Sequence, residues 1–493
     1  VGGYVDNWNS SADWAVNSYW VNSHTDHKLQ FITASTVVQV KSKNVYNAEN
    51  VYKNILNVNG LTEAVNKGAV SSLEIFVTDS ITSKVIKIFS FETDGVIQIS
   101  FDDVLQDYYV NYFVTGNNTN DIDITIEQLP LYPGALVFDG VDDWAGCDNL
   151  PLLPKEKGYS IIALRNWITR YDATRYKRPL ISNLDTNDEG AFLIEYRKDE
   201  NVNDVTGSYN SFTDVYIDDN NPITWQTSSS YNGQIIKKGT SKSTNKLCIC
   251  KTYFGQLSNY ANAAIWEIVI LDHDATEEEL TKIKDYFVKT YPWLFPDQAW
   301  TVTGKTNEDE DRATIANITG NGNDLVLSNF GFAEGSGYNE EGEYAGYLVT
   351  DGVDDMITSS AFNIGKDFTI VGDWKFIDNK KSGTGLVKGS SFYIYNTMIG
   401  LDLYINSGSV KNSLDGIKSI NAACSDGRAY DRNWNEILAN TGNVVGSGGI
   451  LEVSSSGGRF DRIAFKNLAI YPRILSKDDC IKAYNYLQTL KSK

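Results

Sequence analysis

Aspartate residues recur with the same spacing at two places in this sequence. Residues 137–143 read Val-Phe-Asp-Gly-Val-Asp-Asp, and residues 349–355 read Val-Thr-Asp-Gly-Val-Asp-Asp. Carboxylate oxygens gathered in a turn are ligands that Ca²⁺ prefers, so each copy predicts a calcium site. The predicted ligands are Asp142 and Asp143 in the first copy and Asp354 and Asp355 in the second. The alternative is that Asp142 and Asp354 only cap backbone N–H groups of a tight turn around the glycine.

Aromatic side chains are the second group with binding chemistry, because a ring face stacks on the C–H groups of a sugar while amides bind its hydroxyls. The chain has 11 Trp, 29 Tyr and 20 Phe, so aromatic residues alone do not single out a site. The candidates for carbohydrate binding are Tyr209, Trp225, Tyr430 and Trp434. A further cluster is interpreted either as a docking or sugar-stacking face or as part of a core: Trp8, Trp14, Tyr19 and Trp20.

Carboxylates arranged for catalysis are harder to find. A retaining glycosidase needs two carboxylates about 5 Å apart. Alternation along a strand places Asp121, Asp123 and Glu127 on one face, and we interpret this face as solvated. Glu195 and Glu267 are single carboxylates on their strands. The sequence therefore favours a protein that is not an enzyme.

Histidine and cysteine add little further chemistry. The three histidines are His24, His27 and His273, and the first two share a polar stretch. We interpret them as loop histidines rather than as a metal pair. Cys248 and Cys250 alternate along a strand, and five cysteines in 493 residues do not form a disulfide framework. We expect buried or free thiols.

The elements that position the two acidic turns also repeat. An apolar segment led by an aromatic residue follows each turn, at Tyr159–Leu164 and Phe368–Gly372. Each of these segments predicts a buried strand. Farther along, Ala264–Leu271 and Arg462–Tyr471 predict the closing strand of each copy.

Each closing strand leads into a predicted helix. Thr276–Glu279 and Ser476–Asp479 have the pattern of a capping box, with Asp in place of Glu in the second, and apolar residues follow both at helical spacing. The two acidic turns are 212 residues apart, which is the size of a domain with a linker. We therefore predict two copies of one fold, at about 137–292 and 348–490.

The acidic turn, the series of short strands and the closing strand with its helix resemble the concanavalin-A-like (laminin-G-like) jelly roll. The resemblance implies a sandwich of two antiparallel sheets, often with Ca²⁺ near the sheet edge. The family includes lectins, glycosidases and adhesive spacers, so the resemblance does not choose among these functions. Residues 304–338 also resemble an element found beside such jelly rolls in structural proteins of phages and bacteria of the gut Bacteroidota.

The fold class predicted for the whole chain is mainly β, in the form of antiparallel sandwiches. Alternating segments in residues 1–130 predict a small N-terminal sandwich of about seven strands for docking or adhesion, with a short helix within 44–67. Leu129–Gly134 predicts a linker, and residues 199–221 predict a long loop. The remaining predicted parts are jelly roll 1 at 135–296, a connecting segment at 297–346 and jelly roll 2 at 347–493.

The charge of the chain limits its partners. The formal net charge is −20, from 43 Lys and Arg against 63 Asp and Glu. A phosphate-binding face needs clustered basic side chains, so we expect no nucleic-acid partner. No apolar run of about 18 residues is present, and we expect no membrane insertion.

Three functions fit these observations. The first is a virion structural protein, a phage head- or tail-fibre or decoration component at the virion surface that attaches to a host-surface glycan. The resemblance then implies other virion proteins as partners and a homotrimer. The second is a bacterial cell-surface protein that binds glycans. The third is a glycoside hydrolase, for which the sequence lacks a clear carboxylate pair.

Overall fold

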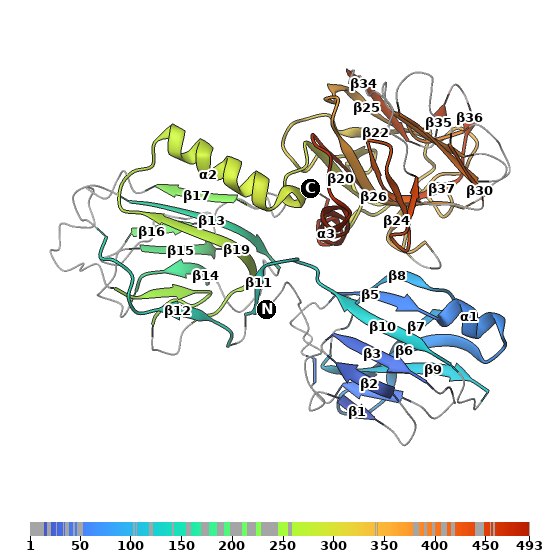
Figure 1. Cartoon of the computed structure of the whole chain (residues 1–493), viewed down its shortest axis with the longest axis horizontal. Helices are drawn as coiled ribbons and strands as arrows, with labels where there is room; N and C mark the ends of the chain where they lie inside the picture. The colour runs from blue at the N-terminus through green and yellow to red at the C-terminus, as the bar shows by residue number, and fades with distance from the viewer. Residues whose placement is uncertain are drawn as a thin grey trace. The chain divides into compact units, whose positions relative to one another are not determined.

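The computed structural model describes residues 14–16, 21–25, 27–32, 34, 39–42, 45–46, 53–101, 104, 106–117, 122–140, 142–153, 159–168, 177–184, 192–197, 210–213, 223–227, 245–254, 259–340, 342, 344–377, 384–388, 392–396, 400–405, 412–415, 420–438, 448–453, 455–456 and 459–492. Within these residues the chain is mainly β, with several antiparallel sheets and three α-helices (Figure 1). The prediction of a mainly β chain is confirmed. No helix of this part of the chain is long and apolar enough to span a membrane. The chain forms two compact units that divide after Glu277.

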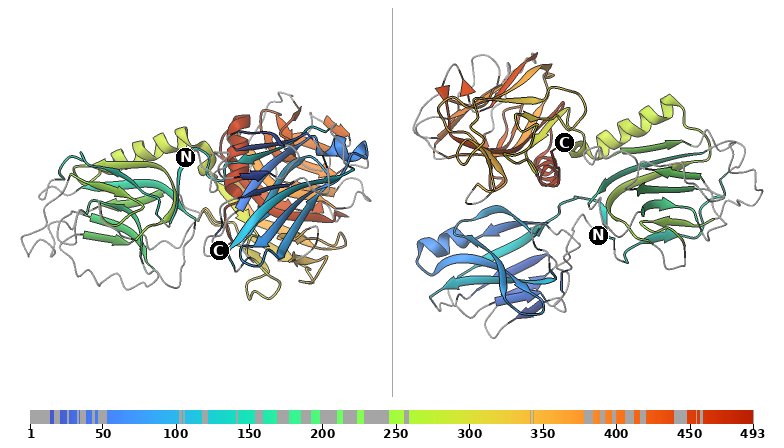
Figure 2. Two further views of the ribbon diagram at one scale, coloured as in Figure 1. Left: turned by 90° about the horizontal axis from the view of Figure 1, so that it is seen from below. Right: turned by 180° about the vertical axis from the view of Figure 1, so that it is seen from behind.

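We describe three parts: the N-terminal module (residues 14–129), the first repeat (132–277) and the second repeat (298–492). In the N-terminal module, two five-stranded sheets enclose one hydrophobic core (Figure 2). The first sheet has the order β1 (Trp14–Val16), β4 (Gln39–Ser42), β9 (Tyr108–Gly116), β6 (Val70–Asp79) and β7 (Val85–Phe91). The second has the order β2 (Val21–Thr25), β3 (Lys28–Phe31), β10 (Ile124–Leu129), β5 (Lys53–Asn59) and β8 (Gly95–Ser100).

Period-two alternation builds the core of the N-terminal module. In β6, Leu73, Ile75 and Val77 are fully buried, and the residues between them are only half-buried. Seven strands agree with the segments predicted from the sequence, and β1, β2 and β5 are additional. β5 is not predicted from the sequence because a polar residue, Asn54, occupies a buried position in it. The Asn54 side chain accepts a hydrogen bond from Gln128. The helix α1 (Leu61–Asn66) lies within the stretch 44–67, as predicted.

The first repeat also has two sheets around one core. One sheet has the order β11 (Leu136–Asp139), β19 (Asn262–Leu271), β13 (Ser160–Trp167) and β17 (Ile223–Thr227). The other has the order β12 (Ala145–Cys147), β18 (Leu247–Ile249), β14 (Lys177–Ser182), β15 (Phe192–Arg197) and β16 (Asn210–Thr213). The pair β15–β16 is parallel, so the prediction of purely antiparallel sheets is wrong at this pair. The strand β16 also lies inside the predicted loop 199–221, and the rest of that loop is outside the described residues.

The second repeat has the same plan with longer sheets. One sheet has the order β23 (Gly337–Asn339), β24 (Tyr347–Val349), β37 (Ile463–Tyr471), β26 (Thr369–Phe376), β31 (Ile420–Cys424), β32 (Ala429–Asp431) and β33 (Glu436–Leu438), and β20 (Gln298–Thr301) also pairs with β37. The other has the order β21 (Thr314–Ile315), β22 (Leu325–Ser328), β25 (Met356–Asn363), β34 (Gly448–Val453), β27 (Thr384–Lys388), β28 (Phe392–Asn396), β29 (Gly400–Ile405) and β30 (Asn412–Asp415). A small two-stranded sheet consists of β35 (Ser455–Ser456) and β36 (Arg459–Phe460).

The segment 297–346, which the sequence predicts as a connection, contributes strands to both sheets of the second repeat. β20 and β23 join the sheet of β37, while β21 and β22 join the sheet of β25. Trp300 of β20 is fully buried in the core of this repeat. We therefore assign these strands to the second repeat.

The closing strand pairs with the same register in both repeats. In the first, Ser160 lies opposite Leu271 and the register shifts after Leu164, so that Trp266 bulges out of the ladder. In the second, Thr369 lies opposite Tyr471 and the register shifts after Asp373, so that Lys466 bulges out. These positions correspond one to one along the strands. A β-bulge is a specific local feature, so its recurrence at one place indicates two copies of one scaffold.

A buried hydroxyl ties the end of the closing strand in both copies. Ser160 donates to the carbonyl of His273 and accepts from the N–H of Ala275. Thr369 donates to the carbonyl of Arg473 and accepts from the N–H of Leu475.

The repeat also begins earlier than the acidic turn. Residues 132–137 read Tyr-Pro-Gly-Ala-Leu-Val, and residues 344–349 read Tyr-Ala-Gly-Tyr-Leu-Val. The N–H of Ala135 bonds to the carbonyl of Tyr132, and the N–H of Tyr347 bonds to the carbonyl of Tyr344, both at 3.0 Å. The stretch predicted as a linker therefore contains the first turn of the repeat.

A helix follows the closing strand of each repeat, as predicted. These helices are α2 (Glu277–Thr290) and α3 (Lys477–Leu487), and a 3₁₀ turn, η4 (Pro292–Leu294), comes after α2. Ser476 caps α3 by accepting the N–H of Asp479, and its hydroxyl donates to the Asp479 carboxylate. The N-cap predicted at Ser476 is confirmed, but the Asp479 carboxylate binds the Ser476 hydroxyl and not the Ser476 backbone N–H, so the reciprocal bond of a capping box is not formed.

Candidate functional site

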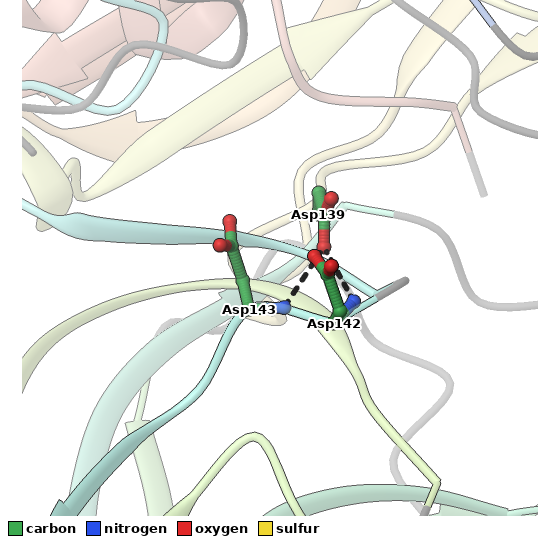
Figure 3. Close-up of side chains that lie close together, drawn as sticks. All are labelled: Asp139, Asp142 and Asp143. Carbon is green, nitrogen blue, oxygen red and sulfur yellow. Dashed lines mark hydrogen bonds between the residues drawn. The ribbon is translucent and has the colours of Figure 1, made fainter.

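The first acidic turn lies between β11 and β12. Asp139 ends β11, and its carboxylate accepts the N–H groups of Asp142 and Asp143, each at 3.4 Å (Figure 3). The carboxylate oxygens of these three residues lie within 4.8 Å of one another. Asp142 and Asp143 are exposed, and Asp139 is half-buried. The turn therefore gathers three hard oxygen donors at the surface of the first repeat.

The second acidic turn has the same three positions, with a more buried geometry. Asp351 accepts the N–H of Val353 at 2.7 Å and of Asp354 at 3.4 Å. Asp355 is only 1% exposed, and it accepts the N–H of Asp351 at 2.8 Å and the hydroxyl of Ser336 at 3.1 Å. The three carboxylates again lie within 4.8 Å of one another.

Removal from water, together with nearby negative charge, raises the pKa of one carboxyl in each turn. Burial raises the pKa of the Asp355 carboxyl to about 6, and the charges of Asp351 and Asp354 act in the same direction. The pKa of Asp143 is also raised, because its carboxyl is partly removed from water although the residue as a whole is exposed, and the charges of Asp139 and Asp142 add to the effect. A bound cation would reverse this effect, because it favours the ionised carboxylate.

The glycine of each acidic turn is required by the backbone. Gly140 and Gly352 have φ of 79° and 75°, in the left-handed region that other residues avoid. A Cβ on Gly140 would also lie 2.9 Å from the backbone nitrogen of Asn262, and one on Gly352 would lie 3.2 Å from that of Arg462. Each turn thus packs closely against the chain that enters the closing strand.

The donor set fits Ca²⁺ in chemistry and is incomplete in number. Ca²⁺ takes roughly 6–8 oxygen ligands, so backbone carbonyls or water would have to complete each site. The sequence predicted four of the six clustered carboxylates as ligands: Asp142, Asp143, Asp354 and Asp355. It missed Asp139 and Asp351, although both lie in the repeated motif. The alternative that Asp142 and Asp354 cap the turns is wrong, because the oxygens that accept N–H groups of the turns belong to Asp139 in the first turn and to Asp351 and Asp355 in the second.

Of the four aromatic residues predicted to bind carbohydrate, two are buried and two have side chains outside the described residues. Tyr430 is fully buried and Trp434 is 6% exposed, so neither offers the open ring face that sugar stacking needs, and this prediction is corrected. Trp434 packs between Tyr430 and Tyr484 of α3, which explains its burial. Trp225 lies on β17, but its side chain is outside the described residues, as is the whole of Tyr209.

Trp144 is an exposed aromatic residue that is not among the candidates predicted from the sequence. It directly follows Asp143, is 38% exposed and makes an edge contact with Phe254 at 5.6 Å. The ammonium of Lys251 lies 4.1 Å from its ring centroid. Its position next to the repeated motif was the signal that could have identified it.

The other chemical candidates are structural or lie outside the described residues. Asp123 is exposed and accepts a hydrogen bond from Gln30, in agreement with a solvated strand face, whereas Asp121 is not described. His27 bonds to Gln128, and the side chain of His24 is not described. Cys248 and Cys250 are buried and form no disulfide, as expected.

Comparison with known proteins gives only distant likenesses. No protein-family model matches this chain, and no curated protein matches it. A sialidase of Trypanosoma rangeli in complex with sialic acid is 9% identical, with a TM-score of 0.29 over 46% of this chain and 41% of the sialidase chain. A structure described as a receptor binding domain is 14% identical, with a TM-score of 0.29 over 41% of this chain and 53% of the other.

The alignments therefore span about two fifths of the sialidase chain and about half of the receptor-binding-domain chain. The extracellular region of zebrafish Gpr126/Adgrg6 is 9% identical, with a TM-score of 0.18 over 93% of this chain and 53% of the other. At such low TM-scores, none of these likenesses supports an argument about function.

Proposed function

We propose that this chain is a non-enzymatic attachment protein of a virion, a fibre or decoration component whose repeats bind host-surface glycans. In this proposal both repeats are concanavalin-A-like jelly rolls, and Ca²⁺ binds at their acidic turns. The observation that carries the proposal is the recurrence of a three-carboxylate turn on two scaffolds with the same register and the same bulge.

Duplication of a surface feature favours binding over catalysis. Two modules on one chain raise the overall avidity for a repetitive ligand, because the second binding event becomes intramolecular. A polysaccharide on a cell surface is such a ligand. A hydrolase needs only one paired set of carboxylates in a cleft, with the acid and the nucleophile in different environments.

The virion setting rests on the resemblance of the repeats, and of residues 304–338, to structural proteins of phages. The acidic composition adds to it, since a net charge of −20 keeps a protein that is exposed to solvent on many sides soluble. Because Tyr430 and Trp434 are buried in the second repeat, we propose Trp144 of the first repeat as the aromatic side chain that contacts a sugar.

The first test is binding of the full chain to an array of host-type surface polysaccharides, with and without Ca²⁺. We expect binding that depends on Ca²⁺ and leaves the chain length of the polysaccharide unchanged. Depolymerisation of the polysaccharide would contradict the non-enzymatic role. Failure to bind any glycan in either condition would contradict the attachment role.

Matched variants assign the calcium sites. The double variant Asp142→Asn, Asp143→Asn should abolish the Ca²⁺-dependent rise in melting temperature of the first repeat, while Asp148→Asn, an exposed aspartate just after β12, should leave it unchanged. In the second repeat, Asp354→Asn is paired with the exposed control Asp367→Asn. Equal Ca²⁺ responses of the variants and their controls would exclude the acidic turns as the binding sites.

Trp144→Ala tests the sugar contact. We expect weaker glycan binding with an unchanged Ca²⁺ response. The control is Tyr286→Ala, which removes a similarly exposed aromatic ring from α2. An equal loss of binding in both variants would show that Trp144 has no specific role.

A further inference from the structure

Two buried cysteines of the second repeat lie against each other. Cys424 is the last residue of β31, Cys480 lies near the start of α3, and both are fully buried. Both are free thiols, and their side chains are hydrogen-bonded to each other. The pair therefore joins the sheet of the closing strand to the helix that follows it.

The surroundings hold the Cys424 sulfur beside the start of α3. Thr369 lies opposite Cys424 in the ladder, and its hydroxyl oxygen is 3.6 Å from the Cys424 sulfur. The same sulfur is 3.9 Å from the carbonyl oxygen of Leu475. The N–H of Cys480 bonds to the carbonyl of Ser476, so the helix backbone fixes the second cysteine.

The first repeat has no cysteines at these positions of the same scaffold. The residue opposite the hydroxyl that ties the closing strand is Thr227 in the first repeat and Cys424 in the second. The fourth residue of the following helix is Leu280 in the first repeat and Cys480 in the second. The scaffold therefore does not require a cysteine at either position.

The hydrogen bond makes the two thiols unequal in acidity. Donation from Cys480 lowers the pKa of the Cys424 thiol, because it stabilises the thiolate; burial opposes this effect and the Thr369 hydroxyl supports it. The same hydrogen bond and burial raise the pKa of the Cys480 thiol. A thiolate beside a second thiol is the starting arrangement for disulfide formation by thiol–disulfide exchange.

We propose that Cys424 and Cys480 form a disulfide that links β31 to α3 when the chain meets a low-molecular-weight disulfide such as glutathione disulfide. The Cys424 thiolate attacks one sulfur of this reagent, the S–S bond of the reagent breaks, and one thiol leaves. The Cys480 sulfur then loses its proton and attacks the Cys424 sulfur, which releases the second thiol. Two electrons and two protons pass from the cysteine pair to the reagent, which is reduced to two thiols.

The disulfide changes the strength of one repeat only. Because both sulfurs are buried, the exchange takes place during folding or when the start of α3 opens locally. The link closes a long loop of the chain and restricts the unfolded state, so it stabilises the second repeat. Disulfides persist in oxidising surroundings and are rare in the cytosol. The second repeat is therefore stronger outside a reducing compartment.

The test is incubation of the full chain in glutathione buffers that range from fully reduced to fully oxidised, with and without mild urea, until the number of free thiols is constant. All samples carry Cys147→Ser, because Cys147 is exposed and can link two chains. Peptide mass spectrometry after alkylation in denaturant should find a peptide linked through Cys424 and Cys480. Cys248 and Cys250 are buried thiols of the first repeat and should remain open to alkylation.

Two readouts accompany the linked peptide. Oxidation should raise the melting temperature of the second repeat by several degrees, and Cys480→Ala should remove this rise. Cys480→Ser should trap glutathione on Cys424, whereas Cys424→Ser should trap less on Cys480, because Cys424 is the attacking thiolate.

Three outcomes would overturn the proposal. The first is the absence of the linked peptide in every oxidised buffer, with or without urea. The second is linkage of Cys248 or Cys250 in equal yield. The third is a rise in melting temperature that persists in Cys480→Ala. Equal amounts of glutathione on the two single variants would overturn the assignment of Cys424 as the attacking group.

Discussion

The aspartates of each acidic turn have two different roles. Asp139 and Asp351 point back into the turn and accept backbone N–H groups, while Asp142 and Asp354 are exposed. Asp139 and Asp351 therefore stabilise the turn. Asp142 and Asp354 instead present carboxylate oxygens at the surface that could bind a metal ion. An ion would draw both kinds of carboxylate together.

Substitutions in the second turn separate these roles. Without Ca²⁺, Asp351→Ala should lower the free energy of unfolding of the second repeat by about 0.5–2 kcal/mol, as the loss of a cap does. Asp354→Ala should change it by less than about 0.5 kcal/mol, as is usual for an exposed side chain. Urea denaturation in the presence of a chelator measures both. An equal loss in the two variants would contradict this division.

The raised pKa of Asp355 predicts a specific pH dependence. Its pKa is about 6 in the folded chain and close to 3.8 in the unfolded chain, so the folded state binds the proton more tightly. Stability from this group is therefore present at low pH and is lost as pH rises from about 4 to about 6. Without Ca²⁺, the melting temperature of the wild type minus that of Asp355→Asn should increase as pH falls through this window. A constant difference would show that Asp355 titrates normally.

At the scale of the elements, the closing strand organises each repeat. β19 and β37 each pair with the strand of the acidic turn and with the central buried strand, in corresponding registers. A single hydroxyl, from Ser160 or Thr369, then fixes the chain where it leaves the closing strand. The scaffold of the acidic turn thus depends on a few local contacts that both copies retain.

Removal of this hydroxyl should destabilise either repeat. Thr369→Val keeps the shape of the side chain but leaves the carbonyl of Arg473 and the N–H of Leu475 without their partner, at a cost of about 1–3 kcal/mol. Ser160→Ala should have a similar effect in the first repeat. Thr358→Val, at a half-exposed position of β25, is the control and should be nearly neutral. Urea denaturation measures the free energy of unfolding of each variant. An unchanged free energy of unfolding in Thr369→Val would show that this hydroxyl does not stabilise the repeat.

The sequence predicted the elements whose periodicity is strong. The strands β13, β19, β26 and β37 are apolar over many residues and were found, as were the helices α2 and α3, which place apolar residues at helical spacing. The strand β5 was missed because the buried Asn54 interrupts its apolar pattern, and β20 was missed because four residues carry too little periodicity. Aromatic residue type did not predict exposure, since Trp434 lies in a polar stretch yet packs against Tyr484 of a distant helix.

For the whole molecule, the main observation is that the hydrophobic core is divided. Three large clusters, one each in the N-terminal module, the first repeat and the second repeat, share no residue within the part of the chain described. A chain of 493 residues is too long for one core, and separate cores are the usual solution.

Separate cores predict unfolding in more than one step. Calorimetry should give a van't Hoff enthalpy smaller than the calorimetric enthalpy. Leu73→Ala, in the core of the N-terminal module, and Leu348→Ala, in the core of the second repeat, should each destabilise a different transition by about 2–5 kcal/mol. A single transition that moves equally in both variants would show that the chain unfolds as one unit.

The pairing of the first and last strands has a mechanical consequence. In the first repeat, β11 runs antiparallel beside β19, with Leu136 opposite Ile265, so the chain enters and leaves at the same end of the pair. In the second, Gln298 of β20 lies opposite Ile470, near the end of β37. Tension applied through the flanking segments loads these hydrogen bonds one after another, as in a zipper, and not all together. Each repeat should therefore yield by peeling, and in the attachment role proposed above this would let the attachment lengthen before it breaks.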